Sequence, residues 1–203
     1  MSKKAIGIDI GGTGIKGALV DLKRGRLLSE RIRYATPEGG TPKAIAATLR
    51  DLISRLPNSD GLPVGICFPA VVSHGVTMSA ANVSKEWIGL DADRLFEKEL
   101  KRTVHVLNDA DAAGLAEAKF GAAKDKRGLI IMATLGTGIG TALINNGKLI
   151  PNSELGHLEI DGVDYESMAS FAAKEKDNLS FEQWAKRLQK YFSKLEALFT
   201  PDL

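Results

Sequence analysis

Two clusters in this 203-residue chain combine residue types that could carry chemistry. In the first, Asp9 stands directly before the glycine-rich residues 11–14, and Lys16 follows them. Glycine tolerates positive φ and has no Cβ, so a turn of such residues can point several backbone N–H groups at one anion. A carboxylate beside a phosphate needs a cation between them, most often Mg²⁺. We therefore expect a phosphate site in which Asp9 holds magnesium, directly or through water.

The second cluster is Asn108 with Asp109. It follows the apolar run 104–107 and precedes the alanine-rich segment 109–120, so it lies where a strand meets a helix. Asp109 could simply be the N-cap of that helix. It could also accept a proton from a substrate hydroxyl as that oxygen attacks a phosphorus atom. Together with a phosphate site, the second interpretation describes phosphoryl transfer to an alcohol.

The glycine-rich pattern occurs twice. Residues 136–144 read GTGIGTALI and align with residues 12–20, so a second turn of the same kind is expected. A repeated unit of this size indicates two related domains, here residues 1–108 and 109–203, facing each other across a cleft. The residues that we expect to hold phosphate are Gly11, Gly12, Thr13, Gly14, Lys16, Gly136, Thr137 and Gly138.

Two familiar nucleotide motifs are excluded. Residues 12–17 fit G-x-G-x-x-G, but a dinucleotide site needs a helix to open at the glycines, and here a strand follows. The chain also lacks the G-x-x-x-x-G-K-[ST] string. What remains is a β-turn that holds phosphate with backbone N–H groups.

Apolar periodicity and turn residues predict the elements that position these clusters. We expect strands at 5–10, 15–20, 26–34, 62–68, 71–78, 104–107, 129–135, 139–144 and 148–150. Helices are expected after Thr41, after Asp91, over 109–120, and after Ser180, where Gln183 completes a capping box. The last helix carries an apolar stripe that we expect in the core: Phe181, Trp184, Leu188, Tyr191, Leu195 and Leu198.

Composition limits the possible partners and compartments. There are 27 Lys and Arg against 25 Asp and Glu, so the net charge of +2 gives no general reason to expect nucleic acid or a membrane. The single Cys67 cannot form an internal disulfide, and no apolar run approaches the roughly 20 residues of a membrane span. We expect a cytoplasmic protein without a membrane anchor.

A third cluster could bind a sugar. Glu154, His157 and Glu166 place hydrogen-bond acceptors and a donor within a short stretch, and Asn82 could add an amide. Such groups suit the vicinal hydroxyls of a sugar, although a lone histidine is more often structural.

The motifs at residues 9–13, 108–114, 135–140 and 154–157 resemble those of the ROK sugar kinases. The resemblance implies an α/β actin-like ATPase fold, of the hexokinase and ribonuclease H-like type, with Asp109 as general base. It assigns Asn82, Asn108, Glu154, His157 and Glu166 to glucose hydroxyls. It also implies that both glycine turns hold the phosphoryl donor together with Mg²⁺.

Within this family, residues 156–162 are most like those of the members that use inorganic polyphosphate. Residues 158–170 contain no cysteine, so the zinc loop of many ROK proteins is not expected. We expect polyphosphate as the first donor and ATP as the second, with glucose as acceptor. A path for polyphosphate could run over Lys98, Lys101 and Arg102 or over Lys124, Lys126 and Arg127, although such a run is more often an ordinary solvated face.

Family members continue beyond the last helix of this chain. We therefore expect a C-terminally truncated second domain with an incomplete sheet, and a last helix open to self-association as a homodimer. Two alternatives are a sugar-binding fragment with impaired catalysis and an ATP-dependent glucokinase or mannokinase. A sugar-responsive transcription regulator is disfavoured, because residues 1–4 leave no room for a DNA-binding motif before the first glycine turn.

Overall fold

The computed structural model describes residues 3–203. The chain forms two compact units, Met1–Ala112 and Ala113–Leu203, and the division lies inside α3 (Asp109–Phe120). The domain boundary after residue 108 that the sequence predicts stays a prediction. No helix in the described part of the chain is long and apolar enough to cross a membrane.

The first unit is built on a six-stranded sheet of order β3-β2-β1-β5-β9, with β4 also paired to β2. Its strands are β1 (Lys4–Ile10), β2 (Gly14–Asp21), β3 (Arg26–Leu27), β4 (Ile32–Ala35), β5 (Val64–Phe68) and β9 (Val104–Asn108). β1 and β2 are antiparallel, whereas β1, β5 and β9 run parallel.

The single strand predicted over residues 26–34 is wrong, because the chain forms two short strands there. Leu28 N–H still donates to the Leu19 carbonyl, but the Leu19 N–H donates to the Ser29 hydroxyl at 3.0 Å. A side chain thus replaces a backbone carbonyl in the ladder, and regular pairing stops. The predicted strand at 71–78 is likewise a hairpin of β6 (Val72–Ser73) and β7 (Val76–Thr77), since His74 and Gly75 adopt positive φ.

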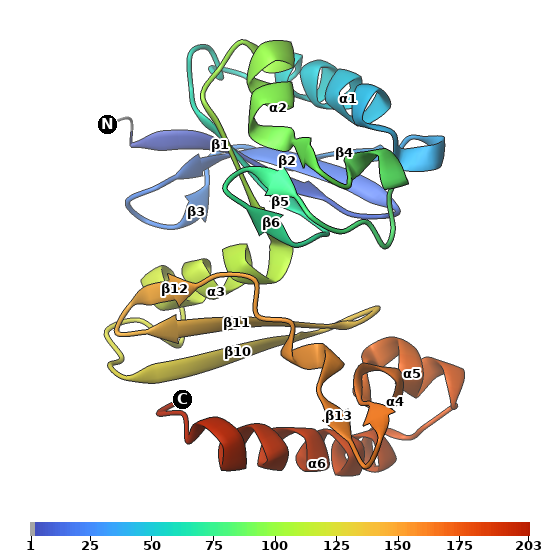
Figure 1. The fold of residues 1–203 in the computed structure, drawn as a ribbon. Coiled ribbons are helices and arrows are strands. Elements are labelled where there is room, and N and C mark those ends of the chain that lie inside the picture. Colours follow the sequence, from blue (N-terminus) through green and yellow to red (C-terminus); the bar gives the residue numbers. More distant parts are fainter. Residues whose placement is uncertain (1–2) are drawn as a thin grey trace. The chain divides into compact units, whose positions relative to one another are not determined.

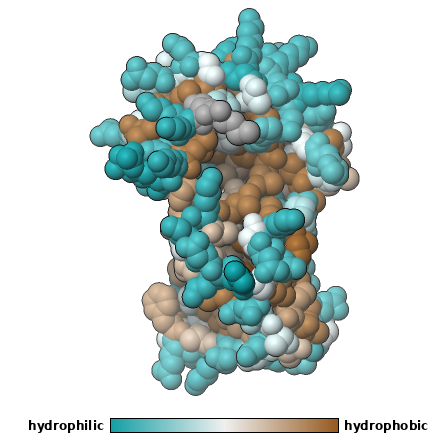
Figure 2. Space-filling view, turned by 90° about the vertical axis from the view of Figure 1, so that its left-hand side faces the viewer, coloured by the Kyte–Doolittle hydropathy of each residue, from teal (hydrophilic) through white to brown (hydrophobic). Residues whose placement is uncertain are grey.

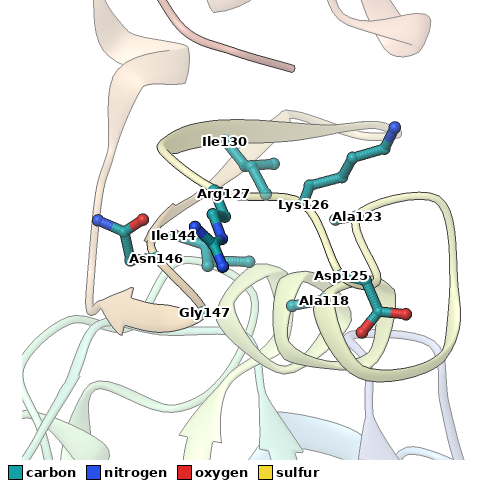
Figure 3. Close-up of a pocket in the computed structure, with 9 residues that line it drawn as sticks. All are labelled: Ala118, Ala123, Asp125, Lys126, Arg127, Ile130, Ile144, Asn146 and Gly147. Carbon is teal, nitrogen blue, oxygen red and sulfur yellow. The ribbon is translucent and has the colours of Figure 1, made fainter.

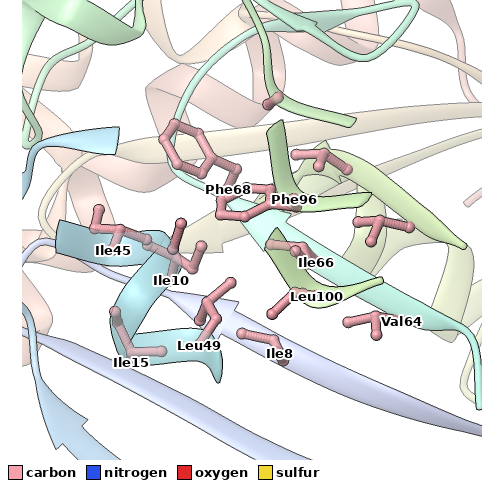
Figure 4. Close-up of a cluster of buried hydrophobic side chains, with 14 of the residues drawn as sticks. Ile8, Ile10, Ile15, Ile45, Leu49, Val64, Ile66, Phe68, Phe96 and Leu100 are labelled. Carbon is pink, nitrogen blue, oxygen red and sulfur yellow. The ribbon is translucent and has the colours of Figure 1, made fainter. Parts of the chain in front are cut away.

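One face of this sheet carries the main core. α1 (Pro42–Ser54) and α2 (Ala92–Leu100) lie over it (Figure 1), and alternate residues of β1 and β5 pack beneath them (Figure 4). Thr41 caps α1, as the sequence predicts. Trp87, from η2 (Lys85–Trp87), is fully buried between Phe68 and Phe96, with ring centroids 4.5 and 5.7 Å away. The strand β8 (Leu90–Asp91) completes a small sheet with β6 and β7.

The second unit contains a three-stranded sheet of β10 (Leu129–Leu135), β11 (Ile139–Asn145) and β12 (Lys148–Ile150). Ile130 and Ile144 pack with Ala118 of α3, whereas Ile131 and Ile139 pack with α6 (Phe181–Phe199). The predicted meander is therefore present, with one helix on each face. The remaining elements are η3 (Leu155–His157), β13 (Glu159–Ile160), β14 (Val163–Asp164), α4 (Glu166–Ala169) and α5 (Phe171–Lys176).

Helix α6 begins with the predicted capping box of Ser180 and Gln183. Its apolar stripe is only partly core: Tyr191 and Leu195 are buried, but Phe181 is 69% and Leu198 54% exposed. The prediction that the whole stripe is core is therefore wrong at its two ends. After α6, the chain returns to β10, where Asp202 N–H donates to the Leu129 carbonyl at 2.7 Å.

Gly17 allows α1 to approach β2. A Cβ at this position would collide with Cδ2 of Leu52, which is fully buried. We expect Gly17→Ala to lower the free energy of unfolding by about 1–3 kcal/mol, because a well-packed core has no room for the added methyl group. Urea unfolding measures the change.

Gly65→Ala is the matched control, since Gly65 also lies in a strand and has nothing within 4 Å of its Cβ position. An equal loss of stability in both variants would show that strand propensity, and not the Leu52 contact, causes the effect.

Candidate active site

The parallel strands of the first unit end at a common edge. Asp9 lies opposite Cys67, and Cys67 lies opposite Leu107, so β1, β5 and β9 finish side by side. Asp109 follows directly after β9. Ligands of α/β sheets bind beyond the carboxyl ends of such strands.

The first glycine turn continues from this edge. The Gly11 N–H donates to the Gly14 carbonyl at 2.9 Å, and the Thr36 hydroxyl donates to the Gly11 carbonyl at 2.5 Å, so the turn is closed and tied to the strand beside it. A Cβ on Gly12 would lie only 3.0 Å from Cβ of Asn82. Glycine is therefore needed at residue 12 to admit the segment that carries Asn82.

A cavity of about 350 Å³ opens beside this turn. It is lined by Gly12, Thr36, Pro37, Glu38, Gly39, Gly40, Asn82 and Val83. The structure thus brings together Gly12 and Asn82, which the sequence analysis selected on separate grounds. Glu38 was missed, although an acid before two glycines was visible in the sequence. The loop is fixed from behind, because Trp87 Nε1–H donates to the Gly40 carbonyl at 2.8 Å.

Asp9 and Lys16 face each other across the β1–β2 pair. Lys16 Nζ lies 3.0 Å from Asp9 Oδ2, and both side chains are about half exposed. No group of three His, Cys, Asp or Glu that could hold a metal occurs within residues 3–203. Mg²⁺ in phosphate-transfer sites commonly takes one or two carboxylates and completes its shell with phosphates and water. Asp9 beside a phosphate-binding turn fits that mode of binding.

Asn108, and not Asp109, caps α3. Its Oδ1 accepts from the N–H groups of Ala110 and Asp111 at 2.9 and 3.1 Å, and its Nδ2 donates to the Ala70 carbonyl at 3.1 Å. The interpretation of Asp109 as the N-cap is therefore wrong. Asn108 is 8% exposed and already bound to backbone through both ends of its amide.

Two groups at this edge, Asp109 and Cys67, have raised pKa values. Burial raises the pKa of Asp109, and the charge of Asp9 adds to this effect, although the Ala110 N–H opposes it. Burial also raises the pKa of Cys67 to about 11, with further contributions from Asp9 and Asp109. The strand register pairs Cys67 with Asp9 and with Leu107, and Asp109 follows two residues after Leu107. An Asp with a raised pKa is a better proton acceptor than an ordinary one.

The second glycine turn is one residue shorter than the first. The flanking pair is Leu135 with Ile139, four positions apart, whereas Ile10 and Ile15 are five apart. The Gly136 N–H donates to the Gly138 carbonyl at 2.9 Å. Glu166 reaches this turn from α4, because its carboxylate accepts from the Ile139 N–H at 2.7 Å and occupies the space where a Gly138 Cβ would lie.

The segment with Glu154 and His157 is anchored on β11. The Thr141 hydroxyl donates to the Ser153 carbonyl at 2.6 Å and accepts from the Leu155 N–H at 3.1 Å. A Cβ on Gly156 would collide with the Ile139 carbonyl, so only glycine fits there. On the other side, the Tyr191 hydroxyl donates to the Leu155 carbonyl at 3.0 Å.

His157 lies among carboxylates. Its Nδ1 is 2.8 Å from Asp164 Oδ2, and this hydrogen bond raises the pKa of His157, with smaller contributions from Glu166 and Glu154. The second unit therefore gathers Glu154, His157 and Glu166, as the sugar-binding hypothesis requires. Asp164 was missed in the sequence, because only the β13–β14 hairpin brings it back to residue 157.

Comparison with known proteins identifies the family. The model of the ROK family matches residues 5–177. The chain belongs to the ROK family. A relative from Mycobacterium tuberculosis, named polyphosphate glucokinase, is 46% identical over 204 residues, which cover 99% of this chain and 76% of the relative.

Solved structures agree with this assignment. The inorganic polyphosphate/ATP-glucomannokinase of Arthrobacter sp. strain KM is 52% identical, with a TM-score of 0.92 over 99% of this chain and 81% of that one. A ROK family glucokinase from Streptomyces griseus, in complex with glucose and AMPPNP, is 25% identical, with a TM-score of 0.79 over 98% of this chain and 80% of that one. The predicted actin-like α/β fold class is confirmed.

Removal of the Asp164 carboxylate should lower the pKa of His157. We expect Asp164→Asn to move the pKa back toward the ordinary value, because the main cause of its elevation is lost. NMR titration of the imidazole measures it. Since the raised pKa stabilises the fold only while His157 is protonated, the variant should lose more stability at pH 5 than at pH 8.

His74 and His105 lie in the first unit and are internal controls in the same spectra. A His157 titration that does not move in the variant would show that the pair does not form in solution.

Proposed function

We propose that this ROK protein transfers a phosphoryl group from inorganic polyphosphate, or from ATP, to the 6-hydroxyl of glucose. The observation that carries the proposal is the position of Asp109, which follows β9 directly at the edge where the parallel strands β1, β5 and β9 end. The relatives named polyphosphate glucokinase and polyphosphate/ATP-glucomannokinase support the choice of donor and acceptor.

Asp109 is the proposed general base. As the sugar oxygen attacks phosphorus, the new O–P bond forms and the bond from phosphorus to the leaving phosphate oxygen breaks. The hydroxyl proton passes to the Asp109 carboxylate. Burial favours this step, because a raised pKa brings the carboxylate nearer to the proton affinity that the reaction needs.

The two glycine turns are the proposed donor site. Backbone N–H groups at Gly11, Gly12, Thr13 and Gly14 and at Gly136, Thr137 and Gly138 would bind phosphate oxygens, and Lys16 would add a positive charge. Asp9 would hold Mg²⁺, which supplies charge neutralisation for the donor phosphates when bound. In the structure Lys16 forms an ion pair with Asp9. When the donor binds, Lys16 would leave the Asp9 carboxylate and pair with a phosphate instead.

The acceptor site is assigned to groups from both units. Asn82 lines the cavity beside the first turn, and Glu154, His157 and Glu166 gather in the second unit. Asn108 is assigned to the same site, but its amide also caps α3, so we expect its contribution to be mainly the positioning of Asp109.

Two further assignments belong to the proposal. A cytoplasmic setting is proposed because the single cysteine forms no internal disulfide. A homodimer is proposed because α6 leaves Phe181 and Leu198 more than half exposed.

Asp109→Asn should abolish turnover without unfolding the chain. We expect a loss of at least about 100-fold in kcat, the usual effect of removing a general base. Because burial raises the pKa of Asp109 above its unfolded value, the ionised carboxylate costs stability at neutral pH. The variant should therefore be at least as stable as the parent at pH 7, and this advantage should vanish below the ordinary pKa of Asp.

Coupled assays of glucose 6-phosphate and thermal melts at several pH values measure both effects. Asp60→Asn is the control, since it makes the same change at a fully exposed side chain. Retention of normal turnover by Asp109→Asn would exclude this residue as the base.

Initial rates with glucose and each donor test the donor assignment. We expect faster turnover with polyphosphate than with ATP at matched concentrations of phosphoryl groups. A strong preference for ATP would contradict the order of donors, and glucose binding by calorimetry without product from either donor would support the sugar-binding alternative.

A further inference from the structure

A separate cavity of about 670 Å³ lies in the second unit, where β10 begins and β11 ends (Figure 3). It is lined by Ala118, Ala123, Asp125, Lys126, Arg127, Ile130, Ile144, Asn146 and Gly147. The glycine turn is at the opposite end of β10. Since a strand rises about 3.3 Å per residue, the seven residues of β10 separate the two places by about 20 Å.

The backbone around this cavity is fixed. The Gly128 N–H donates to Asn146 Oδ1 at 3.0 Å, and the Asn146 N–H donates back to the Gly128 carbonyl at 2.9 Å. Within the loop, Lys124 and Lys126 N–H groups donate to the carbonyls of Gly121 and Ala123, each at 3.2 Å. The loop that carries the charged side chains is therefore hydrogen-bonded to the β11–β12 turn. Its backbone is already ordered before a ligand binds.

The charge at this cavity is mainly positive. Figure 3 shows the Arg127 guanidinium in the middle of the lining residues, with the Lys126 side chain extending outward. Neither side chain forms an ion pair or hydrogen bond within residues 3–203. Asp125 is the one acid in the lining. Nearby, Glu117 and Asp202 already accept the N–H groups of Ala122 and Leu129.

More cations flank the cavity in sequence. Lys119, Lys124 and Lys148 are exposed on the ends of the elements that form it. Figure 2 shows this side of the molecule, on which hydrophilic and hydrophobic residues alternate. Several unpaired cations around one fixed hollow attract a polyanion, and the attraction weakens with salt.

The lining favours an inorganic anion. A guanidinium matches the geometry of phosphate oxygens, which it can bind in pairs. No aromatic ring is among the residues that line the cavity, so a nucleobase would find nothing to stack on.

We propose that this cavity binds phosphate groups of long inorganic polyphosphate, through Arg127 and Lys126, as a second contact remote from the glycine turn. The proposal rests on the proposed function, because it concerns the same donor. Only a chain long enough to reach both places would gain from the second contact, which then forms at a high effective concentration. Short polyphosphates and ATP would gain nothing.

The double variant Lys126→Gln/Arg127→Gln tests this. We expect the KM for long-chain polyphosphate to rise about tenfold, as the loss of two charge-assisted contacts on an exposed site implies, with kcat unchanged. The KM for tripolyphosphate and for ATP should stay the same. The salt dependence of the KM for long-chain polyphosphate should become weaker.

Lys98→Gln/Lys101→Gln is the matched control, since it removes two charges from the other basic run, in the first unit. An unchanged KM for long-chain polyphosphate in the Lys126→Gln/Arg127→Gln variant would overturn the proposal. A rise of this KM in the control variant alone would also overturn it. Equal losses with ATP and tripolyphosphate would also overturn it, because they would indicate a general defect.

Calorimetric titration of the full chain with long-chain polyphosphate separates this proposal from the proposed function. If no donor supports turnover but binding weakens in the Arg127 variant, the kinase proposal fails and the cavity assignment stands. If single-stranded RNA binds at physiological salt through Arg127 and polyphosphate does not, the cavity serves nucleic acid and the proposal fails.

Discussion

The candidate site depends on one hydrogen-bonded side chain, the amide of Asn108. It satisfies two backbone N–H groups at the start of α3 and donates to the loop after β5. Free helix N–H groups must find an acceptor. The Asp111 N–H finds Asn108 Oδ1, and the Ala110 N–H is shared between Asn108 Oδ1 and Asp109 Oδ1. The Asp109 carboxylate accepts the Ala110 N–H at 2.8 Å through Oδ1, and it lies directly after β9 at the edge of the sheet.

The strand register completes this arrangement. Parallel pairing of β1, β5 and β9 brings their ends together, and alternation puts Ile6 and Ile8 into the core while Asp9 lies one residue further on, directed to the other face. A slip of one residue would bury Asp9 and expose the isoleucines. The helices that cover the apolar face thus determine on which face of the sheet the Asp9 carboxylate lies.

The sequence predicted what local patterns encode. Both glycine turns, the meander of the second unit, the Thr41 cap and the Ser180 capping box follow from residue type and spacing, and all are present in the structure. The choice between Asn108 and Asp109 as the cap could not be made, because both are good capping residues and only tertiary contacts decide between them. Asp164 and Glu38 were also missed because tertiary contacts place them. The β13–β14 hairpin brings Asp164 to His157, and a loop brings Glu38 to the cavity beside the first glycine turn. The apolar stripe on α6 was predicted to be entirely buried, but Phe181 and Leu198 are exposed. Periodicity shows which face of a helix is apolar, but not how much of that face other residues cover.

Cys67 lies between the two acids at the end of its strand, and its environment keeps its thiol protonated. With a pKa of about 11, about one thiol in ten thousand carries a negative charge at pH 7. Oxidants and electrophiles react with the thiolate form, so the Cys67 sulfur has low reactivity. Burial of the thiol is the main cause, and the negative charges of Asp9 and Asp109 add to it, so peroxide should leave Cys67 intact.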